Sequence, residues 1–297
     1  MALAVSINGV ITAPEKACVS VFDHGFLFGD SIYEVVRTVG GKMFMFDAHM
    51  QRLRRSAAYL DLEIPVDDQT LHDWAVATME AGGNEESYMR LIITRGAGKV
   101  HIDPGTASNP SVIFMVKGFK PYPTECYEKG IRPAVVTVRR NHPQALNPAA
   151  KTGNYLNSML ALMEAQKFDA TDALMLSHSG YLTEATTSNL FFISRGVLCT
   201  PSLSCGILPG ITRRIINEAA GRVNLEVKEG KYRKRSLYEA DEAFISSTLK
   251  DVMPIAEVYD VAEERTIRIG HGRPGPLTRK LMKTWPEIVQ EFMQQYR

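Results

Sequence analysis

The chain has few cysteines and no long apolar run. Its four cysteines (Cys18, Cys126, Cys199 and Cys205) are scattered over 297 residues, with no CxxC pair and no histidine at metal-ligand spacing. A disulfide framework and a metal site are therefore not expected, and the pattern is typical of a reduced, cytoplasmic protein. No stretch approaches the roughly 20 apolar residues that span a bilayer. We therefore expect a soluble protein.

An excess of charge of one sign is also lacking. The 34 lysines and arginines nearly balance 33 acidic residues, which leaves a formal net charge of +1. This balance gives no reason to expect a nucleic-acid or membrane partner. Apolar residues make up 45% of the chain and charged residues 23%, as in ordinary globular proteins. The length is sufficient for two domains.

Strand-like and helix-like patterns alternate in the first 118 residues, which we interpret as a smaller N-terminal domain. The expected elements are a hairpin turn at Asn8-Gly9, a strand at 42–46, a helix capped by Asp47 and running to Leu60, a helix at 71–81 ended by Gly82-Gly83, and strands at 88–95 and 111–116.

Prolines punctuate the next segment, 119–130, which shows little periodicity and is predicted to be an interdomain linker. Residues 131–297 then form the expected larger C-terminal domain. Its predicted elements are a strand at 132–138, a helix at 154–167, strands at 173–176 and 190–193 bridged by a turn at 177–180, and a helix from Pro209-Gly210 to about Val223.

Lys151 is the first residue that indicates chemistry. It lies within AsnProAlaAlaLysThrGlyAsnTyr, between a loop and an apolar helix, and its small neighbours would let a bulky ring approach. A desolvated lysine has a depressed pKa and is able to form an imine with an aldehyde. Lys151 is therefore a candidate covalent anchor.

Three further segments have features of a site for a phosphorylated pyridine. Glu184 precedes a run of small hydroxyl residues, and an acid beside a pyridine nitrogen keeps that nitrogen protonated. Pro209 and Gly210 open a helix with Thr212 in its first turn, where exposed amides favour a phosphate. Thr248 follows a strand and is a candidate hydroxyl donor.

In this order and spacing, the four segments resemble the class IV aminotransferases, the fold-type IV enzymes that use pyridoxal 5′-phosphate (PLP). The N-terminal half takes part, because PheGlyAspSerIleTyrGluValValArg at 28–37 and PheAspAlaHisMetGlnArgLeu at 46–53 resemble family signatures. The resemblance spans nearly the whole chain. It implies an α/β (α+β) fold of two domains, a small N-terminal one and a larger C-terminal pseudo-barrel.

Carried over position by position, the resemblance makes Lys151 the covalent anchor and proton shuttle. Glu184 would bind the pyridinium nitrogen and Tyr155 the ring O3′. The remaining cofactor contacts would be Arg52, the amides of Ile211 and Thr212, the Thr212 hydroxyl and Thr248 at the phosphate, and Leu208 against the ring. Arg54 and Arg55 lie on the same helix as Arg52, but helical periodicity puts Arg52 nearer the buried face.

Substrate specificity is less clear from the sequence. Two positions resemble those of the branched-chain enzymes. Arg90 lies in a TyrMetArg tripeptide like the one whose arginine helps to receive the α-carboxylate in that group, and Arg37 also fits the group. Those enzymes usually have tyrosine where this chain has Phe28. They also have Thr-Ala-Ala where this chain has Thr248-Leu249-Lys250, a change that would narrow or recharge the substrate pocket.

Other features resemble the D-amino-acid aminotransferases. These are TyrGluValVal, which starts at Tyr33, and the loop that carries Lys99 and His101. In that group an arginine usually stands where Lys99 is, and lysine lacks its bidentate fork. The predicted substrate positions are therefore Phe28, Tyr33, Arg37, Arg90, His101, Leu249 and Lys250.

The preferred hypothesis is a transaminase for branched-chain L-amino acids with 2-oxoglutarate as acceptor. The alternatives are a D-amino-acid aminotransferase, then an aminodeoxychorismate lyase or an amine transaminase of the same scaffold, and last a non-enzymatic PLP-binding module. The resemblance also implies a homodimer with active sites at the interface. The partners would be small amino acids and keto acids, with no nucleic acid, membrane or metal.

Overall fold

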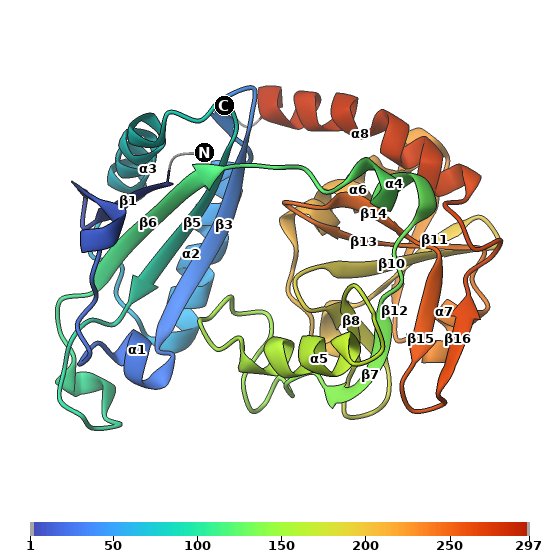
Figure 1. Cartoon of the computed structure of the whole chain (residues 1–297), viewed down its shortest axis with the longest axis horizontal. Coiled ribbons are helices and arrows are strands. Elements are labelled where there is room, and N and C mark those ends of the chain that lie inside the picture. Colours follow the sequence, from blue (N-terminus) through green and yellow to red (C-terminus); the bar gives the residue numbers. More distant parts are fainter. Residues whose placement is uncertain (1–2, 296–297) are drawn as a thin grey trace. The chain divides into compact units, whose positions relative to one another are not determined.

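The computed structural model describes residues 3–295 of the chain (Figure 1). Contacts between residues divide it into two compact units. The first unit comprises residues up to Lys120 together with the segment Ala150–Asn154, and the second comprises Pro121–Ala149 and Tyr155–Gln295. Lys151 therefore packs with the N-terminal residues, although it lies in the second half of the chain. The linker predicted at 119–130 lies near the boundary between the two units, but it does not account for the return of Ala150–Asn154 to the first unit.

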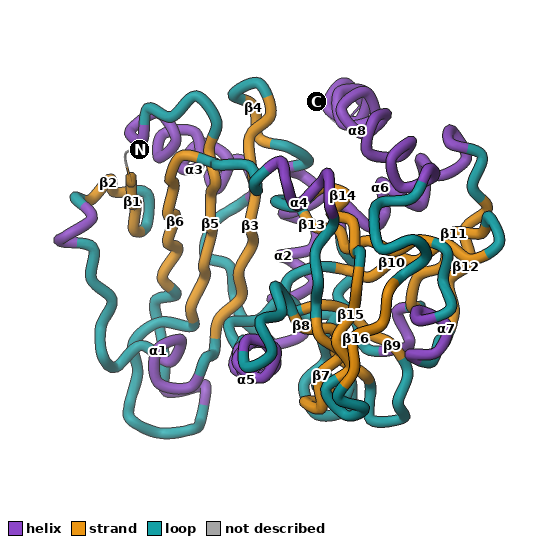
Figure 2. Tube along the Cα trace, turned by 45° about the vertical axis from the view of Figure 1, so that its right-hand side comes forward, coloured by secondary structure: helices purple, strands orange, loops and turns teal. Residues whose placement is uncertain are grey.

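A six-stranded antiparallel sheet forms the centre of the first unit, in the order β2-β1-β6-β5-β3-β4. Figure 2 shows β6, β5 and β3 side by side. The strands are β1 (Leu3–Ile7), β2 (Val10–Thr12), β3 (Ser31–Val39), β4 (Lys42–Met43), β5 (Ser87–Thr94) and β6 (Ser111–Gly118). The helices are α1 (His24–Phe28), α2 (Phe46–Leu60) and α3 (Asp68–Gly82), with short 3-10 turns at Pro14–Lys16 and Pro104–Thr106.

The two faces of this sheet differ in character. Alternate strand residues point to opposite faces, and the face that carries Ile32 and Val36 packs against Met50 and Leu53 of α2 and against α3 to form the core. The opposite face carries Tyr33, Arg37, Tyr88 and Arg90, because the register pairs Arg37 with Tyr88 and Val35 with Arg90. Three of the predicted substrate residues therefore share one face.

The Lys151 segment extends the edge of β3 in this unit. Tyr33 donates its amide to the Lys151 carbonyl at 3.0 Å, and Gly153 donates to the Ser31 carbonyl at 2.7 Å. An isolated bridge pairs Ile32 with Thr152. Because β4 pairs only with the far end of β3, the near end of that edge is open to this segment. Lys151 is thus held by main-chain hydrogen bonds.

A branched ten-stranded sheet forms the second unit, with the path β12-β11-β10-β9-β8-β7-β15-β16 and with β13 pairing both β10 and β14. The strands are β7 (Ala134–Arg139), β8 (Ala173–Leu176), β9 (Leu182–Ala185), β10 (Asn189–Ser194), β11 (Val197–Pro201), β12 (Glu226–Gly230), β13 (Glu242–Ser247), β14 (Asp251–Ile255), β15 (Glu257–Asp260) and β16 (Arg265–Arg268). The helices are α4 (Thr124–Lys129), α5 (Leu156–Gln166), α6 (Ile211–Ala219), α7 (Lys234–Tyr238) and α8 (Pro276–Gln295), with 3-10 turns at Leu203–Cys205 and Ala220–Val223.

Several sequence predictions need correction. Asp47 is not an N-cap: α2 begins one residue earlier, after Met45 in a left-handed conformation. The turn at 177–180 does not lead directly to β10, because β9 intervenes. The predicted linker contains α4. The mixed helix-and-sheet architecture is confirmed, as is the hairpin turn at Asn8-Gly9, where both residues have positive φ.

Candidate active site

The Glu184 carboxylate is buried at the end of β9 and is held by three donors in the second unit. Arg140 Nε donates to Oε1 at 3.0 Å. Asn189 Nδ2 and the Leu208 amide donate to Oε2 at 3.2 Å and 3.0 Å. The carboxylate is therefore fixed in orientation by an arginine, an amide and the main chain. The sequence indicated Glu184 but gave no signal for Arg140 or Asn189.

Asn189 links Glu184 to the predicted phosphate segments. Its side chain also donates to the Leu208 carbonyl at 2.9 Å, and its backbone lies opposite Ser246 on β13. A Cβ on Gly210 would lie 2.0 Å from Asn189 Oδ1. A side chain at position 210 would therefore displace the Asn189 amide from its observed position.

The start of α6 has the features of an anion site. No side chain of the described residues caps the helix at Gly210, and Thr212 in its first turn is buried. The first amides of such a helix are unsatisfied within it and face the positive end of the helix dipole. In this same unit Thr248 and Leu249 form the turn between β13 and β14. Before that turn, Ser246 Oγ is buried without a hydrogen-bond partner among the described residues.

Lys250 closes the turn that carries Thr248, and its side chain is buried. Its Nζ donates to Asp172 Oδ2 at 2.7 Å, Ser188 Oγ at 3.2 Å and Thr187 Oγ1 at 3.3 Å. This ammonium group therefore forms a buried ion pair. The remaining predicted residue of the second unit, Tyr155, is the N-cap residue of α5.

Lys151 lies in the first unit, beside Tyr33. Its Nζ is 4.2 Å from the centre of the Tyr33 ring. Its backbone amide donates to Ser56 Oγ at 2.9 Å, and that hydroxyl donates to the Arg52 carbonyl at 3.0 Å. The structure thus connects Lys151 to the predicted phosphate-binding helix α2.

Arg52 takes part in a buried charge cluster. Its Nε and Nη2 donate to the two carboxylate oxygens of Glu34, each at 2.7 Å, and His49 Nδ1 lies 2.8 Å from Glu34 Oε2. Arg52 and His49 hold the pKa of Glu34 far below its usual value, although burial acts to raise it. Neither Glu34 nor His49 was predicted from the sequence as a partner of Arg52.

The other predicted substrate residues of the first unit have different surroundings. The guanidinium carbon of Arg90 lies 4.2 Å from the centre of the Tyr33 ring, and Arg90 Nε is buried without a hydrogen-bond partner among residues 3–295. The guanidinium carbon of Arg37 lies 5.4 Å from the centre of the Phe119 ring. Phe28 contacts the His24 ring, and His101 is exposed in its loop.

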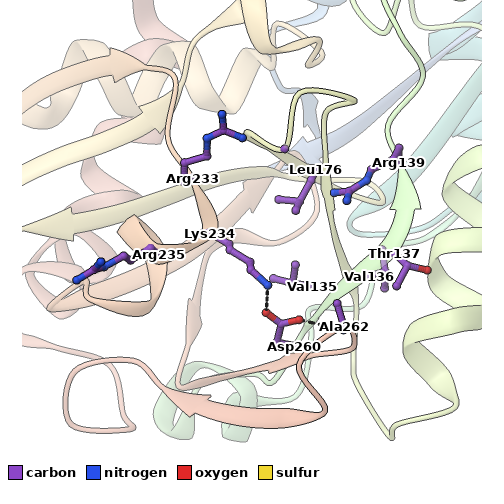
Figure 3. Close-up of a pocket in the computed structure, with 11 residues that line it drawn as sticks. Val135, Val136, Thr137, Arg139, Leu176, Arg233, Lys234, Arg235, Asp260 and Ala262 are labelled. Carbon is purple, nitrogen blue, oxygen red and sulfur yellow. Dashed lines mark hydrogen bonds and ion pairs between the residues drawn. The ribbon is translucent and has the colours of Figure 1, made fainter.

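A cavity of about 360 Å³ lies elsewhere in the second unit (Figure 3). Val135 and Leu176 line its apolar wall, and Lys234 is bonded to the buried Asp260 at 2.6 Å. None of the predicted site residues lines this cavity. Among the described residues no group of metal-ligating side chains occurs, and no helix is both long and apolar enough to span a membrane.

Comparison with known proteins identifies the family. Residues 31–258 match the model of amino-transferase class IV. A Methanocaldococcus jannaschii chain, provisionally named a branched-chain-amino-acid aminotransferase, is 35% identical over 96% of both chains. The Escherichia coli branched-chain-amino-acid aminotransferase is 31% identical over 94% of this chain and 90% of its own. An aminodeoxychorismate lyase from Bacillus subtilis is 30% identical over 86% of this chain and 87% of its own.

Solved structures give the same result. The E. coli branched-chain enzyme has a TM-score of 0.90 at 30% identity, over 97% of this chain and 94% of that chain. The T.th. branched-chain enzyme with pyridoxamine 5′-phosphate has a TM-score of 0.91 at 29% identity, over 100% of this chain and 97% of that chain. The chain therefore belongs to the class IV aminotransferases. It has their fold, and its cofactor is PLP.

The residues present fit this cofactor. Within the second unit, the fixed carboxylate of Glu184 suits a pyridinium nitrogen. The uncapped start of α6 and the buried, unpartnered Ser246 hydroxyl suit a phosphate. Within the first unit, Lys151 is the predicted amine, and its main chain is bonded to β3 and α2.

Proposed function

We propose that this enzyme transfers amino groups from branched-chain L-amino acids to 2-oxoglutarate. Support comes first from the relatives, since the M. jannaschii and E. coli chains are named as branched-chain enzymes. The T.th. enzyme has also been solved with N-(5′-phosphopyridoxyl)-L-glutamate, at a TM-score of 0.90. That compound joins the cofactor to L-glutamate, which is the amino acid formed when 2-oxoglutarate accepts an amino group.

Arg90 is the observation in this chain that carries the substrate proposal. It stands on the face of the first sheet opposite the core face that packs against α2, beside Tyr33, and its buried Nε has no partner among the described residues. A guanidinium group binds a carboxylate through parallel N–H bonds. We assign Arg90 to the substrate α-carboxylate. Phe28, Tyr33, Arg37, His101, Leu249 and Lys250 complete the proposed substrate set.

The roles of the cofactor residues are part of the same proposal. PLP supplies an electron sink that stabilises negative charge at the substrate α-carbon. Lys151 would carry the cofactor until the substrate amine displaces it, and its released Nζ would then take the α-proton and deliver it to the cofactor carbon to which Lys151 had been attached. Glu184 holds the proton on the pyridine nitrogen, and Arg140 and Asn189 hold Glu184. Tyr155 binds the ring hydroxyl oxygen and Leu208 packs on the ring. The phosphate is held by Arg52, the amides of Ile211 and Thr212, the Thr212 hydroxyl and Thr248.

A half-reaction screen tests the substrate assignment. The PLP-loaded enzyme is mixed separately with L-leucine, L-glutamate, D-alanine and D-glutamate, and the absorbance of the lysine-bound cofactor is followed. We expect its rapid loss with both L-amino acids. Loss with the D-amino acids alone would establish the D-amino-acid alternative instead. No loss with any of the four would contradict the proposed transamination and is the result expected of a non-enzymatic PLP-binding module.

We further propose a cytoplasmic homodimer whose active sites lie at the interface. The four cysteines are free, which suits a reducing compartment. Apolar side chains form an exposed stripe on α5, where Leu156 is 65% exposed and Met163 57% exposed. The loop after β5 exposes Val100 and Ile102 as well. Apolar surface gathered in this way is typical of a protein–protein contact.

A further inference from the structure

A charge cluster of three side chains is buried between β3 and α2. Arg52 presents two parallel N–H groups to the carboxylate of Glu34, and His49 occupies one of the same oxygens. The side chains of Glu34 and His49 are 0% exposed and that of Arg52 is 5% exposed. The cluster is therefore excluded from water.

Stability alone does not explain this cluster. Taking two charges out of water costs as much as their attraction returns, and apolar side chains of similar size often stabilise a protein equally well. The neighbours on β3 and α2, such as Val36 and Met50, are ordinary core residues. His49 Nε2 is buried without a hydrogen-bond partner among the described residues. The cluster is thus not a closed structural unit.

The cluster also lies close to Lys151. A chain of two hydrogen bonds leads from the Lys151 amide through Ser56 Oγ to the carbonyl of Arg52. The charge of Lys151 acts on the imidazole of His49 as well. The predicted covalent anchor and the buried arginine therefore belong to one connected site in the first unit.

We propose that Glu34 and His49 are positioning residues that hold the Arg52 guanidinium in the orientation that receives the cofactor's phosphate. This rests on the proposed function, in which Arg52 binds that phosphate. The two parallel bonds to Glu34 fix the plane of the guanidinium, because a bidentate pair permits one relative orientation. His49 in turn fixes the carboxylate through Oε2, as partners of ligand-binding side chains commonly do.

Neutral His49 suits this role. Burial lowers the pKa of His49, and the positive charges of Arg52 and Lys151 lower it further, against the opposite effect of Glu34. A neutral ring donates one N–H to Glu34 and adds no charge. With His49 neutral, the negative charge of Glu34 is balanced by the positive charge of Arg52.

The experiment compares the apparent affinity of the apoenzyme for PLP with that for pyridoxal, which lacks the phosphate. Both are titrated through the absorbance of the lysine-bound form. Glu34→Asp keeps the charge but withdraws the carboxylate, and His49→Leu removes the donor. For both we expect PLP affinity to fall about 10-fold to 100-fold, the usual effect of losing an orienting partner, with pyridoxal affinity unchanged.

Two controls separate positioning from folding. His49→Asn restores an N–H close to the position of Nδ1 and is expected to bind PLP like the wild type. Asp68→Asn breaks the exposed ion pair between Asp68 of α3 and Arg54 of α2 and is expected to change neither affinity. If Glu34→Asp does not fold, the comparison of His49→Leu with His49→Asn remains decisive.

Two results would overturn the inference. PLP and pyridoxal affinities that fall together would show a general structural role, and unchanged affinities would show no role. Both leave the proposed function intact, provided that the wild type binds PLP at Lys151. If the wild type binds neither compound, the proposed function fails and the inference fails with it.

Discussion

Arg140 Nε lies 3.0 Å from Glu184 Oε1, and the same guanidinium donates from Nη1 to Asn157 Oδ1 on α5 at 3.2 Å. The arginine thus bonds to a helix on one side while it fixes the Glu184 carboxylate on the other. The proposed role of Glu184 requires this support, because it depends on where the negative charge is directed.

Replacing Arg140 tests that support. We expect Arg140→Met to lower the half-reaction rate about 10-fold to 100-fold, since Glu184 loses its charged partner. The neighbouring Arg139 is exposed and lines the separate cavity, so Arg139→Met is the matched control. Stopped-flow measurement of cofactor absorbance with L-leucine gives both rates. Equal rates for the two variants would show that Glu184 does not depend on Arg140.

The buried pair of Lys250 and Asp172 predicts a stability effect. Lys250→Met leaves the Asp172 carboxylate buried without its cation, and such a loss costs about 3–5 kcal/mol of unfolding free energy. Lys129→Met, which breaks the exposed Glu125–Lys129 pair, is expected to leave stability unchanged. Urea unfolding of the apoenzymes measures both. A Lys250→Met variant as stable as the wild type would contradict the assignment of this pair.

His49 predicts a pH dependence of stability. Burial lowers its pKa in the folded state below the ordinary value of 6.5, so the unfolded chain binds more protons as the pH falls below that value. The stability that neutral His49 contributes is therefore present above pH 6.5 and is lost on acidification. The pKa of Glu34 is strongly depressed in the folded state, so Glu34 changes the pH dependence of stability only below its ordinary pKa of 4.5.

His49→Asn should accordingly flatten the dependence between pH 6.5 and 5. A single group contributes at most about 1.4 kcal/mol per pH unit to the slope of unfolding free energy against pH. We expect the slope of the variant to be smaller than that of the wild type by up to this amount. Urea unfolding at a series of pH values provides the measurement. Parallel curves for variant and wild type would mean that the pKa of His49 is the same in the folded and unfolded states, which would contradict this prediction.

The exposed stripe on α5 predicts how the chains associate. Charges at Met159 and Met163, which are one helical turn apart, should disrupt a contact that buries them. We expect Met159→Glu with Met163→Glu to sediment as a monomer and Gln51→Glu, at an exposed position of α2, to remain a dimer. A dimeric double variant would place the interface elsewhere.

The sequence predicted more of the fold than of the support around the site. Apolar patterns located α2, α3 and the strands β5 to β8 and β10, but not β3, β9, β11, β12 or β14 to β16. Periodicity also predicted α5 correctly, but from Leu156, Met159 and Leu160, which are exposed in the single chain. An apolar stripe looks the same in sequence whether it faces a core or a partner chain.

Long-range partners could not be predicted in the same way. Glu184 stood out through its neighbours in sequence, whereas Arg140 reaches it from 44 residues away. Arg52 was predicted from the family resemblance, with support from helical periodicity, but its partner Glu34 lies on a different element. Lys250 was predicted to contact substrate, and that role stays a prediction beside its observed pairing with Asp172. Such pairs depend on how strands and helices are brought together.

The most direct test of the central claim is the site of covalent attachment. The PLP-loaded enzyme is reduced with borohydride, digested, and mapped by mass spectrometry, with Lys151→Ala treated in parallel. We predict that the phosphopyridoxyl group is found on Lys151, and that the variant carries no label and shows no transamination. Attachment to any other lysine, or transamination by the Lys151→Ala variant, would contradict the account.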